Sequence, residues 1–542
     1  MLARLLERPK RSINFILFAA VALLPACGGN DKGNSGPVVS VSGKVTFDRV
    51  PHNGDKAGLN YQLTSVAPVR GVRVLLLNRG GDLLDSDTTA ANGTYSLDAP
   101  VATDVRVRVE ARMLLDGTPS WNFSVTDNTH SNALYVLDGQ LVNSGRDDSV
   151  RDLHAVSGWN GEDYAELRPA APFAIMDVVY EAVARIREAD PAVNFPLLEI
   201  RWSTDNIAVS GDKTQGAIGT TFYSLDAQSI YLLGWANNDT DEYDRSVIAH
   251  EFAHYLEYQL GRTDSIGGAH NLTSRLDMRV AFSEGWGSAF AAIAAEDPLY
   301  RDSVGANQST GFVYSVEANP SGNGGWYNEN SVQKILYDLY DSTNEGVDQI
   351  SLGFPPIYQT LTSNAWRQFD GAISIYPFIN QLKANAAVDG QLVDALLEAE
   401  NITGTGNYGE DETNDGGISM VLPVYTLLLL GENLPLCSGK LAGELNGVDV
   451  RRFVRFTLSN SGRYSISAKR LGGLSPSDPD FVLWREGERL ATAESAVDNL
   501  EQLEIALDAG SYWLEIYEHG NIDMEAPTGG AVCFDLSLES AP

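Results

Sequence analysis

Two histidines with a glutamate beside the first are the residues of this chain best placed for chemistry. His250, Glu251 and His254 stand in the order His-Glu-x-x-His. On an α-helix, side chains four residues apart lie on one face with Cβ atoms about 5–6 Å apart, so both imidazoles can reach one metal ion. Paired imidazoles favour Zn²⁺, and Glu251 is placed to act as a general base on water at the open side of the ion.

The surrounding residues predict the helix that this pairing needs. Apolar residues recur at helical intervals from Val247 to Leu260, and Gly261 is placed to end the helix. A β-branched and aromatic run at residues 229–233 predicts a short strand just before it. We expect this strand to offer an edge to which an extended peptide could add.

A catalytic zinc ion needs a third protein ligand, and the best candidate is Glu284. It lies in an apolar run at residues 281–290 that is long enough for a second helix. Gly285 and Gly287 weaken that helix locally, by up to about 1 kcal/mol each relative to alanine, so a packing reason for them is expected. Their small size predicts close packing of the second helix on the first.

The motif at residues 250–254, together with Ser-Glu-Gly-Trp-Gly at 283–287, resembles a zincin metallopeptidase of the gluzincin kind, and the Glu-Gly-Trp context is similar to fungalysin-type, thermolysin-like enzymes. The resemblance implies an α+β zincin-like domain, with His250, His254 and Glu284 as zinc ligands and Glu251 as the base that assists peptide-bond hydrolysis. In that family the residue four after the ligand glutamate is commonly an aspartate that orients a zinc histidine. Here it is Ser288, a neutral residue that raises ligand basicity less.

Hydrolysis also needs a donor to the carbonyl oxygen on which negative charge develops. His270, Tyr327 and Tyr337 follow the motif, and the residues alone do not choose among them. We rank Tyr327 first because it lies in a glycine-rich run just before a predicted helix. The acidic run at residues 237–242 could hold calcium, but it lacks the glycine and the bidentate glutamate of a calcium loop, so we interpret it as a solvated loop.

The composition is that of a soluble globular protein of several domains, with 43% hydrophobic and 20% charged residues. The formal net charge is −34, from 38 basic and 72 acidic residues. A surface of this sign argues against nucleic acid as a partner, because nucleic-acid binding relies on positive charge. Protein or peptide is the expected substrate.

The N-terminus predicts export. Residues 1–26 combine a basic start with an apolar run too short to span a bilayer comfortably, and Leu-Pro-Ala precedes Cys27. This resembles the lipobox of bacterial lipoproteins, which implies cleavage before Cys27 and a lipid anchor on its sulfur. The expected location is the bacterial cell envelope, at the outer membrane or the cell surface. Residues 27–37 predict a flexible tether.

Short alternating runs with turns between them predict all-β sandwich domains on both sides of the central region, 151–432. Residues 38–150 resemble carboxypeptidase regulatory-like domains, and residues 433–542 resemble pre-peptidase C-terminal domains. Cys437 and Cys533 both lie in the second of these, and an even pair in an exported protein predicts a disulfide. The expected fold is therefore multidomain, with the α+β zincin-like domain between two sandwiches.

Two other functions stay open. The chain could be an envelope-surface binding module with a degenerate or structural metal site, which Ser288 and the absence of an obvious oxyanion donor keep possible. It could also be a hydrolase of non-peptide substrates that uses the same metal chemistry. Convergence of Glu284 on the two histidines would argue against the first of these functions.

Overall fold

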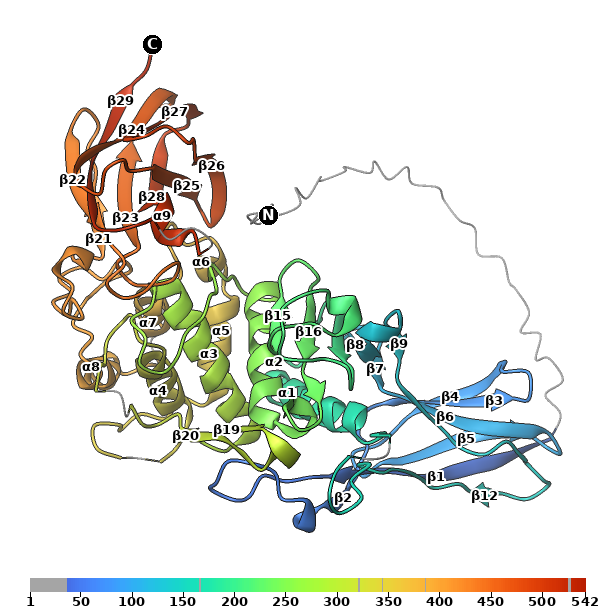
Figure 1. Ribbon diagram of the computed structural model, residues 1–542. Coiled ribbons are helices and arrows are strands. Elements are labelled where there is room, and N and C mark those ends of the chain that lie inside the picture. Colours follow the sequence, from blue (N-terminus) through green and yellow to red (C-terminus); the bar gives the residue numbers. More distant parts are fainter. Residues whose placement is uncertain (1–36, 165–166, 320–321, 344, 386, 525–527) are drawn as a thin grey trace.

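The computed structural model describes residues 37–164, 167–319, 322–343, 345–385, 387–524 and 528–542. Figure 1 shows strands at both ends of the chain and most of the helices between them. The predicted signal segment, Cys27 and most of the tether lie outside the described residues. Among the residues that are described, no helix combines the length and the apolar character needed to cross a membrane.

The N-terminal region consists of strands in which every second side chain is buried. In β5, for example, Tyr95, Leu97 and Ala99 are buried and the residues between them are exposed, which is the alternation of a strand with one face on a core. One sheet is built around β1, and a second has the order β10-β6-β3-β4. The strands of the region are β1 (Val38–Arg49), β2 (Ser65–Pro68), β3 (Arg73–Asn78), β4 (Leu83–Thr88), β5 (Thr94–Pro100), β6 (Asp104–Glu110), β7 (Arg112–Leu115), β8 (Trp121–Asp127), β9 (Ala133–Leu134), β10 (Val136–Asp138), β11 (Val142–Asn143), β12 (Ser149–Val150) and β13 (Leu153–Ala155).

Three of these strands, β7, β8 and β9, cross the expected boundary at residue 150. The central sheet has the order β15-β16-β14-β8-β7, so β7 and β8 lie in one sheet with the strands that precede the histidine motif. β8 belongs to the central sheet because residues 123–126 are all buried, as in a strand covered on both faces. The partners in this sheet are β14 (Leu198–Trp202), β15 (Phe222–Ser224) and β16 (Ser229–Leu232).

Helices cover this sheet and extend beyond it (Figure 1). The first helix of the central region is α1 (Ala171–Ala189). The last α-helix of the central region ends at Ala399, and the chain then continues mostly as loops to residue 430. The other elements are α2 (Arg245–Gln259), α3 (Met278–Ala295), α4 (Glu329–Tyr340), α5 (Phe354–Thr362), α6 (Asn364–Arg367), α7 (Ile375–Lys383), α8 (Gly390–Ala399), β17 (Gly234–Trp235), β18 (Asp239–Thr240), β19 (Leu299–Val304) and β20 (Thr310–Ser315).

The C-terminal region is again made of strands, in two sheets with a separate apolar core. Cys437 and Cys533 form the predicted disulfide. The region meets α3 through Arg279, which is buried and pairs with Asp277 and with Glu515 at 2.8 Å. Its elements are β21 (Tyr425–Leu427), β22 (Asn433–Ser438), β23 (Arg451–Leu458), β24 (Gly462–Gly473), β25 (Pro479–Arg485), β26 (Glu488–Ala493), β27 (Leu500–Leu507), β28 (Gly510–Glu518), α9 (His519–Ile522) and β29 (Val532–Ser540).

Candidate metal site

Helix α2 presents the two histidines of the motif on one face. His250 and His254 are one turn apart, with ring centroids 4.7 Å apart. Phe252 and Tyr255 lie on a different side of the helix and are fully buried. The apolar side therefore holds the helix in the core and leaves the histidine side to face α3.

Helix α3 approaches α2 closely at the level of the histidines. The indole nitrogen of Trp286 donates a hydrogen bond to the carbonyl oxygen of Ala253, at 3.1 Å. A Cβ placed on Gly287 would lie 2.6 Å from the His250 ring, and a Cβ on Gly285 would lie 2.6 Å from the Val332 side chain on α4. The packing reason predicted for the two glycines is present, although Gly285 makes room for α4 and only Gly287 makes room for α2.

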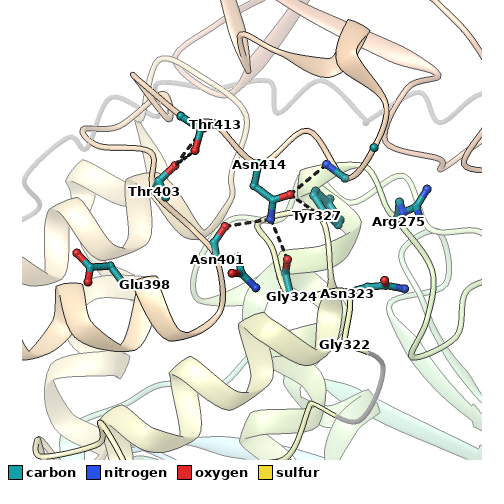
Figure 2. A pocket seen from close by; sticks show the side chains of 12 residues that line it. Arg275, Gly322, Asn323, Gly324, Tyr327, Glu398, Asn401, Thr403, Thr413 and Asn414 are labelled. Atoms are coloured by element: carbon teal, nitrogen blue, oxygen red, sulfur yellow. Dashed lines mark hydrogen bonds between the residues drawn. The ribbon is translucent and has the colours of Figure 1, made fainter.

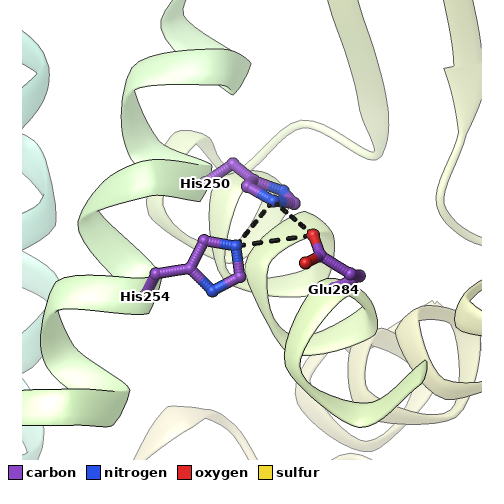
Figure 3. A group of neighbouring side chains, drawn as sticks. All are labelled: His250, His254 and Glu284. Carbon is purple, nitrogen blue, oxygen red and sulfur yellow. Dashed lines mark hydrogen bonds and ion pairs between the residues drawn. The ribbon is translucent and has the colours of Figure 1, made fainter. Parts of the chain in front are cut away.

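Three side chains converge between these helices (Figure 3). The Nε2 atoms of His250 and His254 are 3.0 Å apart, and Glu284 Oε2 lies 3.2 Å from the first and 3.5 Å from the second. A tetrahedral zinc ion with bonds of about 2.0–2.1 Å spaces its ligand atoms about 3.3 Å apart. The side chains are 11%, 17% and 12% exposed, so solvent reaches the cluster. The donor set and its spacing fit zinc.

The charges around the cluster favour a bound cation. Burial by itself would lower the pKa of His254, but the carboxylates of Glu284 and Glu257 raise it well above its usual value. Burial by itself would raise the pKa of Glu284, but His254, His250 and His270 lower it well below its usual value. Glu284 is therefore ionised, and the imidazoles lie in a negative field of the kind that a dication also neutralises.

The other ring nitrogen of each histidine faces a polar side chain. Ser288 Oγ is 3.4 Å from His250 Nδ1, at the position where the resemblance implies a group that orients a zinc histidine. Glu257 was missed: its Oε2 is 3.8 Å from His254 Nδ1 and accepts a hydrogen bond from Ser283 Oγ at 2.7 Å. Its position three residues after His254 was a possible signal, but such glutamates are common on exposed helix faces.

Glu251 is buried beside the sheet. It is 8% exposed, and its Oε2 accepts the backbone N–H of Tyr223 at 2.7 Å. Tyr223 lies in β15, the outermost strand, whose only neighbour among the described strands is β16. The expectation that β16 is the edge strand is therefore wrong, because β15 covers it. The free edge lies one strand further out, next to Glu251.

The three candidate donors lie in different places. The Tyr327 hydroxyl donates to Asn414 Oδ1 at 3.0 Å, in a pocket whose lining includes none of the three converging side chains (Figure 2). Tyr337 is buried on α4. Only His270 reaches the cluster, with Nε2 3.3 Å from Glu284 Oε2 and Nδ1 2.6 Å from Glu329 Oε2. The geometry thus replaces Tyr327 with His270 as the first choice.

The acidic run at residues 237–242 is not the solvated loop that the sequence suggested. Asp241 is 2% exposed and Glu242 is fully buried. Arg168 pairs with Glu242 at 2.7 Å, and Asp241 turns toward other aspartates. The interpretation failed because it rested on the glycine and glutamate positions of a calcium loop. Those positions do not report an acidic cluster that two separate segments build.

Residues 199–370 match a family model described as the Mycolysin C-terminal domain, a domain of metalloproteases. This span is less than half of the chain, and it contains α2, α3 and all three converging side chains. No curated protein matches the chain. The match associates the chain with metallopeptidases and leaves its own reaction to be tested.

Among solved structures, the pre-peptidase C-terminal domain of a collagenase from Bacillus anthracis is 19% identical over 21% of this chain and 93% of its own, with a TM-score of 0.16. A periplasmic inhibitor of g-type lysozyme from Aeromonas hydrophila is 16% identical over 21% of this chain and 95% of its own, with a TM-score of 0.15. Scores this low carry no conclusion about fold or function. The chain is similar to a metalloprotease domain in the segment that holds the candidate metal site.

Proposed function

We propose that this chain is a zinc-dependent endopeptidase that hydrolyses peptide bonds at the bacterial cell envelope. The observation that carries the proposal is the convergence of His250, His254 and Glu284, with the carboxylate of Glu251 one residue from the first ligand. A zinc ion held by these side chains would lower the pKa of water and polarise the carbonyl group of the substrate. The remaining steps fall to groups of the chain itself.

Glu251 is the proton carrier. One of its oxygens is held by the N–H of Tyr223, which fixes the carboxylate and leaves the other oxygen to accept a proton from the attacking water. The same oxygen can then return the proton to the leaving amide nitrogen. His270 supplies the donor for the carbonyl oxygen, because Glu329 holds its Nδ1 and so leaves Nε2 to face the site.

The free edge of β15 supports a peptide as substrate. The Tyr223 N–H points away from β16 and toward Glu251, so a peptide that pairs along this edge would run past the carboxylate. An edge of this kind recognises extended backbone and not a particular side chain. Small non-peptide substrates have no use for it, which favours a peptidase over other hydrolases.

Lipid on Cys27 would anchor the protein to the envelope, at the outer membrane or the cell surface. This part of the proposal rests on the residues around Cys27 alone, because they lie outside the described residues. Proteins or peptides at that surface are the proposed substrates, and the net charge of −34 argues against nucleic acid. Labelling with palmitate and loss of the label in Cys27→Ala would test the anchor.

The test compares zinc content and casein hydrolysis in the wild-type protein and in Glu251→Gln. We expect near one zinc per chain in both proteins, and hydrolysis that falls about 10²–10⁴-fold in the variant, the usual contribution of a general base. Glu257→Gln is a useful second variant, since it changes a carboxylate of the same helix that lies behind His254 and should lower zinc affinity instead. A wild-type protein without bound zinc would refute the proposal.

The second candidate is a surface binding module with a structural metal site. It is favoured by the weak support behind the histidines, where Ser288 is neutral and Glu257 is 3.8 Å from its ring nitrogen. Zinc bound at one per chain without hydrolysis in either protein would select this function. Hydrolysis that depends on Glu251 would exclude it.

A further inference from the structure

The hairpin of β19 and β20 packs beside the first histidine of the motif. Tyr300 of β19 is 9% exposed, and its ring meets the imidazole of His250 at 90°, with centroids 6.1 Å apart. Tyr314 of β20 lies directly opposite Tyr300 in the hairpin, and the two rings stack with centroids 5.1 Å apart. The hairpin therefore places two tyrosines next to a candidate zinc ligand, although it supplies none of the three ligands itself.

The hydroxyl of Tyr314 reaches Ser288, the residue that lies against His250 Nδ1. The Tyr314 hydroxyl oxygen is 3.3 Å from Ser288 Oγ, which in turn is 3.4 Å from His250 Nδ1. Ser288 is 7% exposed, and burial raises the pKa of Tyr314 above its usual value, so both hydroxyls are neutral. These groups form one hydrogen-bonded chain that runs from the imidazole to the hairpin.

The direction of this chain follows from the role of His250. When His250 Nε2 binds a metal ion, the ring carries its proton on Nδ1, and that N–H donates to Ser288 Oγ. The hydroxyl hydrogen of Ser288 can then be donated to Tyr314. A serine side chain has three staggered positions, and a second polar partner favours the position in which both contacts are made. Tyr314 thereby keeps Ser288 Oγ turned toward the imidazole.

We propose that Tyr314 is a positioning residue of the zinc site, which acts through Ser288 to fix the ring of His250. The inference rests on the proposed function in taking His250 as a zinc ligand. A carboxylate at position 288 would accept strongly from Nδ1 because of its charge, whereas a lone serine is a weak acceptor. Donation from Ser288 to Tyr314 polarises the serine hydroxyl and makes its oxygen a better acceptor. The hairpin thus supplies part of what an aspartate would otherwise provide.

The hairpin is itself held in place, as a positioning role requires. Its two strands pair through six residue pairs. The N-terminal region then bonds to it from outside, because the N–H of Leu59 donates to the carbonyl oxygen of Gln308 at 2.7 Å. Arg301 Nε donates to the carbonyl oxygen of Gly54 at 3.0 Å. Tyr314 is therefore carried by an element that two regions of the chain support.

The test measures zinc affinity by competition with a chelator in the full-length protein, Tyr314→Phe, Ser288→Ala and the double variant. Tyr314→Phe removes the hydroxyl and keeps the ring that stacks on Tyr300, and zinc affinity should fall about tenfold. In the Ser288→Ala background the same substitution should change the affinity less than about twofold, because the hydroxyl no longer acts on His250. A merely structural role of Tyr314 would lower the affinity equally in both backgrounds.

Tyr358→Phe is the matched control. Tyr358 lies on α5, is 7% exposed, and donates to Asp190 Oδ2 at 3.4 Å, so the variant also removes a buried tyrosine hydroxyl with a long hydrogen bond. It should bind zinc as the wild type does.

The possible results separate this inference from the proposed function. Equal affinity in the wild type and Tyr314→Phe, or the same loss in both backgrounds, would overturn the inference and leave the peptidase function intact. Zinc binding that depends on Tyr314, without any hydrolysis, would support the inference and refute the peptidase function. A wild-type protein that binds no zinc would overturn both.

Discussion

Two clusters of ionisable side chains lie near α2. One, between α2 and α3, combines histidines with a glutamate, and the other, at the start of α2, consists of aspartates. They differ in the charge of the groups that surround each carboxylate. In the cluster between α2 and α3, imidazoles surround Glu284 and lower its pKa well below the usual value. At the start of α2, burial and neighbouring carboxylates raise the pKa of Asp239 to about 7 and of Asp302 to about 8. A cluster of mixed sign can hold its geometry through its own contacts. A cluster of like charges needs bound protons or a cation to reduce the repulsion between its members. This difference predicts how each cluster responds to metal removal, substitution and pH.

The largest expected effect is the loss of zinc from the cluster between α2 and α3. o-Phenanthroline, which binds zinc, should abolish casein hydrolysis, and added zinc should restore it. Hydrolysis assays and zinc analysis on the same samples check this prediction. Hydrolysis that survives the complete removal of zinc would contradict it.

The second prediction concerns His270, whose imidazole contacts Glu284 but is not one of the three candidate zinc ligands. His270→Ala should lower kcat about 10²–10³-fold with zinc retained, the usual cost of losing an oxyanion donor. Tyr327→Phe is the matched control, since its hydroxyl bonds Asn414 and we expect an unchanged kcat. The opposite ranking of the two variants would restore Tyr327 as the donor. Steady-state kinetics with a peptide substrate and zinc analysis give both readouts.

The third prediction uses the two glycines of α3. A methyl group at Gly287 would lie 2.6 Å from the His250 ring, so Gly287→Ala should displace that ligand and weaken zinc binding by about 10–100-fold. Gly285→Ala meets Val332 instead and should cost about 1–3 kcal/mol of stability with zinc affinity retained. Zinc titration and chemical unfolding of both variants distinguish the effects. If Gly287→Ala and Gly285→Ala bound zinc with equal affinity, α2 and α3 would be able to move apart without disturbing the ligands.

The smallest effect is expected in a third acidic group, which lies in the C-terminal region. Asp480 is 2% exposed, and burial, then the charge of Asp478, raises its pKa to about 9. A carboxyl whose folded pKa is raised stabilises the protonated protein, so its contribution is complete at acidic pH and is lost as pH rises toward 9. Thermal melts at pH 6 and pH 9 should therefore differ by a few degrees less in Asp480→Asn than in the wild type.

Asp508→Asn, at an exposed position near the end of β27, is the control for Asp480→Asn and should keep the wild-type pH dependence. If Asp480→Asn melted with the wild-type pH dependence, other groups would have to account for the loss of stability at high pH.

Much of the local structure follows from sequence patterns. The 3.6-residue period around His250 and the apolar run around Glu284 predicted α2 and α3, because these patterns reflect one helix at a time. The alternation in β5 and β6 predicted strands for the same reason. The choice of ligand types and of the His-Glu-x-x-His spacing needed only the geometry of a single helix.

Those patterns could not predict how segments far apart in the sequence pair with one another. The entry of β8 into the central sheet, the cover of β16 by β15, and the approach of Asp302 to the aspartates before α2 all join residues far apart in the sequence. Tyr327 was preferred to His270 because it lies in a glycine-rich run before a predicted helix, whereas the deciding contact is the one between His270 Nε2 and Glu284 Oε2. Nothing in a local window reports such a contact.

The sequence by itself determined which side chains could bind a metal and that two of them share a helix face, because an α-helix sets that spacing without help. Only the tertiary structure decided that Glu284 points at the same place, that His270 completes the group, and that four aspartates from two separate segments meet. The physical reason is that helix periodicity is a short-range property of the backbone. Convergence of charges depends on how whole elements pack against one another.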